Sequence, residues 1–206
     1  MKYIALDIGN VLCYANMTNF VRDLSDTFNV SIGDASRYLR GFQQIHDLGL
    51  TTMERELRSR FNCHSEVTIE RLCKLWNDAV HPCVSMLSML DELNAQHDVQ
   101  IALLSNIGVE HAAMMDSKLH PIYDYAIPHF SCFVGARKPT MLYYQSFLMQ
   151  YPEFKGCLYV DDLQENLDAS KQFGFDPYLF SLEDADVDDK IREIREIVLD
   201  SDESED

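Results

Sequence analysis

Short apolar runs alternate with longer amphipathic stretches over much of the chain. The runs Lys2–Leu6, Val99–Leu104 and Cys157–Val160 are bounded by turn residues and predict buried strands. Shorter strand-like pieces lie at Tyr125–Ile127, Ser131–Val134 and Pro177–Phe180. Helices are expected near Val109–Lys118, from Pro139 to about Gln150, from about Glu165 to Phe173, and over Asp188–Leu199. This alternation favours an α/β fold, with a parallel sheet covered by helices on both faces.

The stretch from about Thr18 to Gln96 departs from this pattern, because it reads as helical and contains no convincing strand. Ser31 with Asp34, and Thr51 with Glu54, resemble helix starts with an acid in the first turn. Pro82 suits the first turn of a further helix that reaches about Gln96. The sequence thus predicts a core of residues 1–15 and 82–199, a small helical cap of residues 16–81, and a disordered acidic tail of residues 200–206.

Length and composition are those of an ordinary globular protein. The 206 residues suggest one domain with a modest insertion, and 47% are hydrophobic. No run of about 18 apolar residues predicts a membrane-spanning helix, and the N-terminal apolar stretch is too short for a signal peptide. The six cysteines show no metal-binding spacing and are interpreted as reduced thiols. We therefore expect a cytoplasmic protein with no membrane partner.

The charge of the chain is strongly negative and unevenly distributed. The net charge is −17, and residues 183–206 hold twelve acids and three bases, which amounts to −9 of that total. A nucleic acid would be repelled by such a surface, so nucleic-acid binding is not expected. An anionic small substrate would need a local positive pocket.

Polar side chains follow four of the apolar runs. In open α/β sheets, ligands bind at the carboxyl ends of the strands, so these residues are expected at one edge of the sheet. Each alone could be a helix cap or a turn. Together they supply a nucleophilic acid, a hydroxyl, a lysine and an acidic pair: Asp7, Ser105-Asn106, Lys138 and Asp161-Asp162.

That combination has one economical chemical interpretation. An aspartate carboxylate can attack phosphorus and form an aspartyl-phosphate. A carboxylate and a phosphate repel each other, so the approach needs cations. Mg²⁺ held by carboxylates supplies one and a lysine ammonium supplies another, while a hydroxyl and backbone N–H groups complete the cradle.

The order of these motifs resembles the haloacid dehalogenase (HAD) superfamily, in its phosphatase branch, over roughly residues 2–180. It is similar to bacterial sugar-phosphate phosphatases with the same form of motif one and a small helical cap. The four motifs are Asp7-Ile-Gly-Asn-Val, Leu103-Leu-Ser-Asn106, Arg137-Lys-Pro139, and Tyr159-Val-Asp-Asp162 continuing to Asn166.

The resemblance implies a HAD-like, Rossmann-like fold and a role for each matched residue. Asp7 would be the nucleophile, and Ser105 and Lys138 would hold the phosphoryl group. Asn106 would contact the phosphate or the substrate, and Asn166 would orient the acidic loop. Mg²⁺ would be held by Asp7, the Gly9 carbonyl and Asp162, with Asp161 reaching it directly or through water. The expected activity is Mg²⁺-dependent hydrolysis of a small phosphorylated metabolite.

One departure from the family pattern keeps alternatives open. Most family phosphatases have a second Asp two residues after the nucleophile as general acid/base, and here that residue is Gly9. The chain could therefore be a weak or inactive binding or regulatory protein of the same fold. Dehalogenation at carbon is a third possibility, although Asp161-Asp162 looks suited to a metal. The substrate and the oligomeric state stay open.

The helical stretch also contains a histidine and a set of aromatic residues that could contact a ligand. His46 lies just before the Asp47-Leu-Gly49 turn and is the histidine of interest, although an ordinary structural residue is the simpler interpretation. The aromatic residues Phe20, Phe42, Phe61 and Trp76 are predicted to form the core of the cap rather than a substrate platform.

Overall fold

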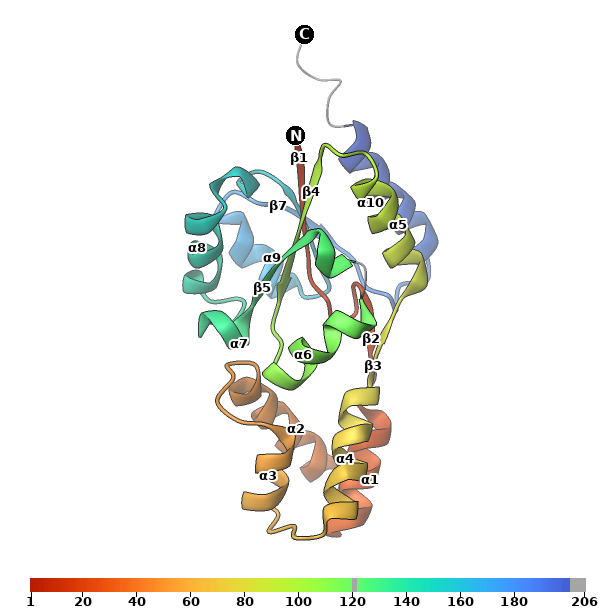
Figure 1. Ribbon diagram of the computed structural model, residues 1–206, viewed down its shortest axis with the longest axis vertical. Coiled ribbons are helices and arrows are strands. Elements are labelled where there is room, and N and C mark those ends of the chain that lie inside the picture. The colour runs from red at the N-terminus through yellow and green to blue at the C-terminus, as the bar shows by residue number, and fades with distance from the viewer. Residues whose placement is uncertain (120–121, 201–206) are drawn as a thin grey trace.

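The computed structural model describes residues 1–119 and 122–200, and its centre is a five-stranded parallel sheet (Figure 1). The central strand of the sheet covers Lys2–Leu6 and ends just before Asp7. Each neighbouring pair of strands is parallel, which confirms the predicted sheet. From edge to edge the strands are β5 (Ala126–Phe130), β4 (Val99–Ser105), β1 (Lys2–Leu6), β6 (Leu158–Asp161) and β7 (Asp176–Leu179).

Alternation along the strands builds a separate core on each face of the sheet. Ile4 and Leu6 of β1 point into one core, and Ala5 points into the other. The first core is covered by α5 (Val84–Asn94), α6 (Val109–Lys118) and α10 (Val187–Asp200), and the second by α8 (Met141–Gln150) and α9 (Gln164–Lys171). Short helical turns η1 (Ile122–Asp124), α7 (Ser131–Val134) and η2 (Pro152–Phe154) complete the connections.

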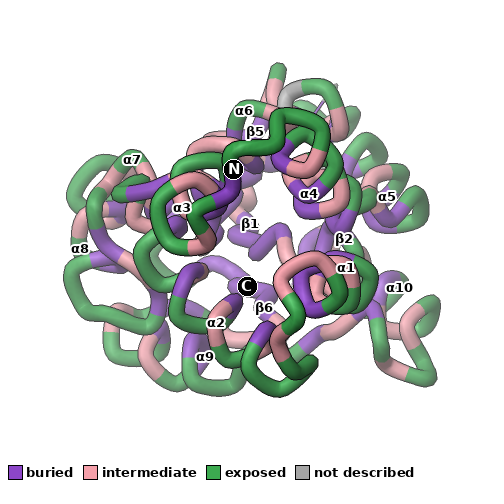
Figure 2. The backbone as a smooth tube through the Cα atoms, turned by 90° about the horizontal axis from the view of Figure 1, so that it is seen from below, coloured by how far each residue is buried: buried purple, intermediate pink, exposed green. Residues whose placement is uncertain are grey.

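Four helices form a second unit at the carboxyl end of the sheet (Figure 1). They surround their own apolar cluster, which includes Phe20, Phe42 and Trp76, with Phe61 packed against it. We call this part the helical unit; it consists of α1 (Thr18–Phe28), α2 (Ile32–His46), α3 (Met53–Ser59) and α4 (Glu66–Asp78). Seen from the helical end, the buried positions of β1 and β6 lie at the centre of the molecule (Figure 2).

A two-stranded antiparallel ribbon joins the helical unit to the sheet. Its strands are β2 (Cys13–Ala15) and β3 (Val80–Pro82), and both predicted cap boundaries fall at this ribbon. The ribbon is extended by two backbone bonds, from Asn16 N–H to the Ala79 carbonyl and from Cys83 N–H to the Leu12 carbonyl. The chain thus enters and leaves the helical unit at one place.

Several sequence-based element predictions need correction. Ser131–Val134 is a short helix rather than a strand, because the strand ends at Phe130 and Gly135 closes the turn in the left-handed conformation. The stretch predicted to lack strands contains β3, which pairs with β2. Pro82 therefore belongs to a strand, and the next helix starts at Val84.

The predicted helix starts were partly right. Ser31 accepts a hydrogen bond from the Asp34 backbone N–H, as expected for the start of α2. The cap of α3 is Thr52 rather than Thr51. The six cysteines are unpaired. Within the described ranges, no helix is long and apolar enough to cross a bilayer. The predicted tail lies outside the described residues except for Asp200.

Candidate active site

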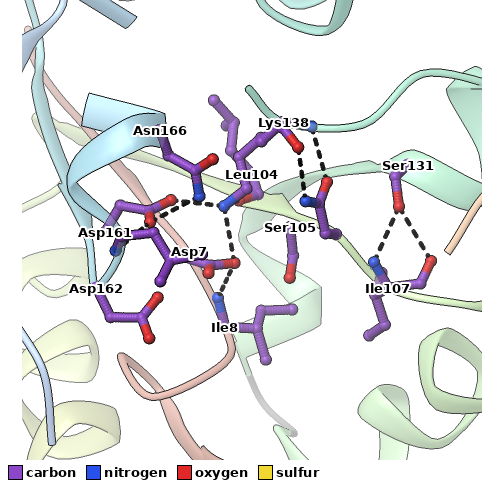
Figure 3. Close-up of polar contacts among 12 residues, drawn as sticks. Asp7, Ile8, Leu104, Ser105, Ile107, Ser131, Lys138, Asp161, Asp162 and Asn166 are labelled. Atoms are coloured by element: carbon purple, nitrogen blue, oxygen red, sulfur yellow. Dashed lines mark hydrogen bonds and ion pairs between the residues drawn. The ribbon is translucent and has the colours of Figure 1, made fainter. Parts of the chain in front are cut away.

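The polar residues predicted from the sequence converge at the carboxyl ends of three neighbouring strands. Asp7 directly follows β1, Ser105 ends β4 and Asp161 ends β6. Because these strands are adjacent in the sheet, their ends bring the side chains together. Figure 3 shows the Asp7 side chain between the Asp161-Asp162 pair and Ser105. Lys138 reaches this edge from the loop before α8.

Lys138 forms the positive centre of the cluster. Its Nζ lies 3.0 Å from Asp7 Oδ1 and 2.7 Å from Asp161 Oδ2, and it donates a 2.7 Å hydrogen bond to the Leu104 carbonyl. Burial acts to lower the pKa of Lys138, but Asp161 and Asp7 outweigh burial and raise that pKa above its usual value. The site therefore contains a fixed, buried ammonium group that can face an anion.

Asn106 clamps the loop that carries Lys138. The Lys138 backbone N–H donates to Asn106 Oδ1 at 2.8 Å, and Asn106 Nδ2 donates to the Lys138 carbonyl at 3.0 Å. One N–H of the Asn106 amide remains for another partner. In this arrangement Asn106 positions the lysine, in addition to any contact with a ligand.

The two acids of the Asp161-Asp162 pair have different surroundings. Asp161 Oδ1 accepts from Leu163 N–H and Asn166 Nδ2, both at 2.9 Å, and its Oδ2 accepts from Lys138 and the Tyr159 hydroxyl. Burial by itself would raise the pKa of Asp161, yet Lys138 and these donors hold that pKa below its usual value. A carboxylate has about four lone-pair sites, so those of Asp161 are filled.

Asp162 is much less occupied. Its Oδ2 accepts a 3.1 Å hydrogen bond from Asn10 Nδ2, and burial raises the pKa of its carboxyl. Two or more lone-pair sites therefore remain for another ligand. This contrast between neighbouring acids is not visible in the sequence, where both simply follow a strand.

Asp7, Asp161 and Asp162 could together hold a metal ion. Each offers a carboxylate oxygen, and the three oxygens lie within 4.8 Å of one another. Burial raises the pKa of Asp7 to about 7; Lys138 opposes this shift, whereas Asp161 and Asp162 add to it. A divalent cation would relieve the repulsion among these acids, and oxygen donors suit a hard cation. The residues present therefore fit such an ion, with Asp162 the least occupied ligand.

A cavity of about 170 Å³ lies beside this cluster, between the chain that follows β1 and β4 and the helical unit. Gly9, Ser105 and Asn106 line it from the sheet side, and Gln43 and Asp47 line it from α2 and the following turn. Trp76 and His111 complete the polar part of the wall. A wider groove of about 630 Å³ shares Ala15 and Met17 with the cavity and leads toward solvent.

Asp47 ties the helical unit to the loops of the sheet. Its Oδ2 lies 2.9 Å from Arg137 Nη2, and its carbonyl accepts a 2.5 Å hydrogen bond from the buried Ser131 hydroxyl. Ser131 Oγ in turn accepts from Ile107 N–H at 2.9 Å, in the loop after β4. Ser131 was missed because its segment was predicted as a strand. Asp47 was noted only as part of a turn.

His46 is buried where the helical unit meets the sheet, and it does not line the cavity. Its ring nitrogens lie 3.1 Å from Glu110 Oε2 and 3.4 Å from Asp47 Oδ1. Glu110 also accepts a 2.9 Å hydrogen bond from Met53 N–H at the start of α3. The structural interpretation of His46 therefore fits best. Trp76 belongs to the helical core, as predicted, and to the cavity wall as well.

Comparisons with known proteins identify the fold. No family model and no curated protein match the chain by sequence. Among solved structures, a HAD family enzyme from Bacteroides thetaiotaomicron superposes with a TM-score of 0.75 at 19% identity, covering 90% of this chain and 96% of that one. That enzyme has also been solved with magnesium and inorganic phosphate, where the TM-score is 0.74.

Two other structures extend the likeness. A predicted HAD-like family hydrolase from Porphyromonas gingivalis gives a TM-score of 0.73 at 18% identity and covers 95% of this chain and 98% of that one. The L-2-haloacid dehalogenase of Xanthobacter autotrophicus gives 0.61 at 14% identity, covering 91% and 80%. The chain therefore has the HAD fold, as the order of its motifs predicted.

Proposed function

We propose that this chain is a member of the HAD superfamily and a Mg²⁺-dependent phosphatase that acts on a small phosphorylated metabolite through an aspartyl-phosphate on Asp7. The observation that carries the proposal is the cluster of Asp7, Asp161 and Asp162 facing the buried ammonium group of Lys138. A nucleophilic acid, a metal site and a fixed cation at one point are what transfer of a phosphoryl group to a carboxylate requires.

Each residue has a definite task in this reaction. An Asp7 oxygen forms a bond to phosphorus while the bond from phosphorus to the leaving oxygen breaks, and the leaving oxygen takes a proton from solvent. Water then attacks the phosphorus, releases inorganic phosphate and regenerates Asp7. Lys138 balances negative charge on the phosphoryl oxygens, and the Ser105 hydroxyl donates a hydrogen bond to one of them. Bound Mg²⁺ would supply further positive charge at these oxygens.

The ligand roles follow from the hydrogen bonds already described. We assign direct metal binding to Asp7, the Gly9 carbonyl and Asp162. Asp161 acts as a positioning residue, because its oxygens already accept from four donors, among them Lys138 and Asn166. Asn106 holds the Lys138 loop and keeps one N–H for the phosphate or the substrate.

The helical unit is proposed as the cap that covers the reaction. It closes the cavity from the side opposite the sheet, and the contacts of Asp47 with Arg137 and Ser131 fix it there. The small cavity supports a metabolite rather than a macromolecule as substrate. The negative charge of the chain argues against nucleic acid, and the six unpaired cysteines support a cytoplasmic location.

Two observations keep other functions in view. L-2-haloacid dehalogenases share the fold, and in this chain Gly9 stands where a general acid is usual. Dehalogenation proceeds at carbon and would not depend on Mg²⁺. A binding or regulatory protein would keep the cluster without turnover.

Hydrolysis of p-nitrophenyl phosphate and a panel of phosphorylated metabolites, with and without Mg²⁺, tests the proposal. We expect Mg²⁺-dependent release of phosphate that Asp7→Asn abolishes, because the amide cannot form the acyl phosphate. Asp168→Asn is the matched control, since Asp168 is an exposed acid on α9. Absence of turnover on all esters would contradict the proposal, as would turnover that is independent of Mg²⁺ or retained by Asp7→Asn.

A further inference from the structure

A buried hydrogen-bond donor without a partner lies in the wall of the cavity. Trp76 is 1% exposed and lines the cavity, and its indole Nε1 has no hydrogen-bond partner among the described residues. Buried polar groups in native proteins are nearly always hydrogen-bonded, so an orphaned donor beside a candidate active site calls for an acceptor.

The neighbouring phenylalanines of the helical core offer Trp76 no acceptor. The indole ring packs edge-on against Phe20 at 5.5 Å and Phe42 at 5.4 Å between ring centroids, and these rings are apolar. The cavity is where Trp76 meets polar groups, since Ser105 and Asn106 line the same space. A group bound in the cavity can therefore supply the acceptor oxygen.

His111 provides the complementary acceptor next to Trp76. The two rings stack with centroids 4.6 Å apart at 21°, and His111 Nε2 lies 3.3 Å from the Trp76 carbonyl. A carbonyl only accepts, so Nε2 carries the hydrogen in this bond. Burial lowers the pKa of His111 to about 4, and the ring is neutral near pH 7. Nδ1 is then a bare acceptor, and His111 lines the same cavity as Trp76.

We propose that Trp76 Nε1–H and His111 Nδ1 together bind one hydroxyl group of the substrate's leaving group, and that this pair selects small hydroxylated phosphoesters. A hydroxyl can accept from the indole and donate to the imidazole at the same time. The inference rests on the proposed phosphatase function and specifies its substrate class.

The size of the cavity agrees with this class. Its volume of about 170 Å³ corresponds to about five or six water molecules in the liquid, at about 30 Å³ each. Pockets for drug-sized ligands are larger, at about 300–1,000 Å³. The wall residues Gln43 and Asp47 add polar groups for further hydroxyls. Among the described residues, none that lines the wall is a lysine or an arginine that could pair with an acidic leaving group.

Steady-state kinetics on matched pairs of esters tests the roles of Trp76 and His111 directly. The probes are glycerol 1-phosphate against propyl phosphate, and sugar phosphates against their deoxy counterparts, with p-nitrophenyl phosphate as reference. For at least one pair, wild type should prefer the hydroxylated ester in kcat/KM. Trp76→Phe should reduce that preference about 3- to 10-fold, the value of one hydrogen bond, and His111→Phe should do the same. The matched control Phe20→Leu disturbs the same core and should lower both esters equally.

A binding experiment reports on the same contact without altering the cavity. Trp76 is the single tryptophan of the chain, so its fluorescence has one source. In the full-length Asp7→Asn protein with Mg²⁺, the hydroxylated ester that wild type prefers should shift the Trp76 emission. The deoxy partner should not.

The outcomes distinguish failure of this inference from failure of the proposed phosphatase function. If wild type hydrolyses phosphoesters without preference for any hydroxylated member, the inference is wrong and the phosphatase proposal stands. The inference is also wrong, and the phosphatase proposal stands, if the preference survives Trp76→Phe or if no ester alters the Trp76 fluorescence. In that case a bound water would satisfy the Trp76 Nε1–H group. If wild type hydrolyses no phosphoester, both the proposed function and the inference fall.

Discussion

Gly108, the residue before α6, lies so close to the helical unit that a single added methyl group should push the helical unit away from the sheet and its helices. An ideal Cβ at this position would lie closer than 3.0 Å to three atoms of the His46 ring, whereas two carbon atoms need about 3.5–4.0 Å. The backbone at Gly108 (φ −84°, ψ 166°) suits alanine, so the effect of Gly108→Ala is steric and not conformational.

The His46 ring has little room to move away. It is fully buried, stays within hydrogen-bond distance of Glu110, and packs against Phe42 and Trp76. Overpacking a filled core costs about 1–3 kcal/mol, and alanine is a poorer helix cap than glycine by roughly 0.5–1 kcal/mol. We expect Gly108→Ala to lower the free energy of unfolding by about 3 kcal/mol, which for a chain of this size lowers Tm by about 6–12 °C.

Urea unfolding of a double-mutant cycle measures the contact itself. His46→Ala removes the ring, so adding Gly108→Ala to that variant should cost only the small capping term. The coupling free energy should then be about 2 kcal/mol or more, beyond the usual error of additivity. An equal cost of Gly108→Ala with and without His46, or a cost below about 1 kcal/mol in the native protein, would refute this account of the interface.

Three further predictions follow from the site. Asp162→Ala should weaken Mg²⁺ binding in calorimetric titration more than Asp161→Ala does, because the oxygens of Asp161 already accept four hydrogen bonds; the reverse order would exchange their roles. Gly9→Asp should fold, since a Cβ at this position meets no atom within 4 Å and the φ of Gly9 is ordinary. This variant should raise kcat most for esters with poor leaving groups and little for p-nitrophenyl phosphate. An equal effect on both esters would contradict the idea that the chain lacks a proton donor. Burial holds the pKa of His111 near 4, against 6.5 in the unfolded chain. Unfolding therefore takes up a proton between pH 6.5 and 4, and the free energy of unfolding falls as pH drops through that window, by at most about 1.4 kcal/mol per pH unit. When unfolding is measured in urea at several pH values, the profile of His111→Phe should be flatter than that of wild type, and a parallel profile would contradict the lowered pKa of His111.

Much of the fold could be predicted because the apolar runs are strong local signals. The strand at Lys2–Leu6 places Ile4 and Leu6 in one core and Ala5 in the other, and such a run has few other stable arrangements. The short pieces were harder. The run Ser131–Val134 is as apolar as a strand, but Gly135 and the contact of Ser131 with Asp47 make it a helical turn. The ribbon strands have three residues each, too few for a periodicity to appear.

Some residues of the candidate site could likewise be predicted from the sequence, and others could not. Residues at strand ends could be found in the sequence, since the topology of a parallel sheet brings them together at one edge. Lys138 was found by its motif, and the structure adds that it touches two of the acids. Trp76 and His111 could not be paired from the sequence, because they lie in different units and meet only across the interface. Their roles depend on packing that no local pattern encodes.

The position of β1 in the middle of the sheet has a consequence for the order in which the protein is made. Lys2 pairs with Val99 on one side, and Ile4 pairs with Leu158 on the other. At about 5–20 residues per second, a ribosome needs roughly 8–30 s to go from the first of these strands to the last. During that time β1 has no sheet partner on one edge, whereas α1 to α4 can pack with one another once Asp78 has been made. Synthesis therefore favours assembly of the helices before the sheet, and β1 waits longer than the other strands for its second neighbour.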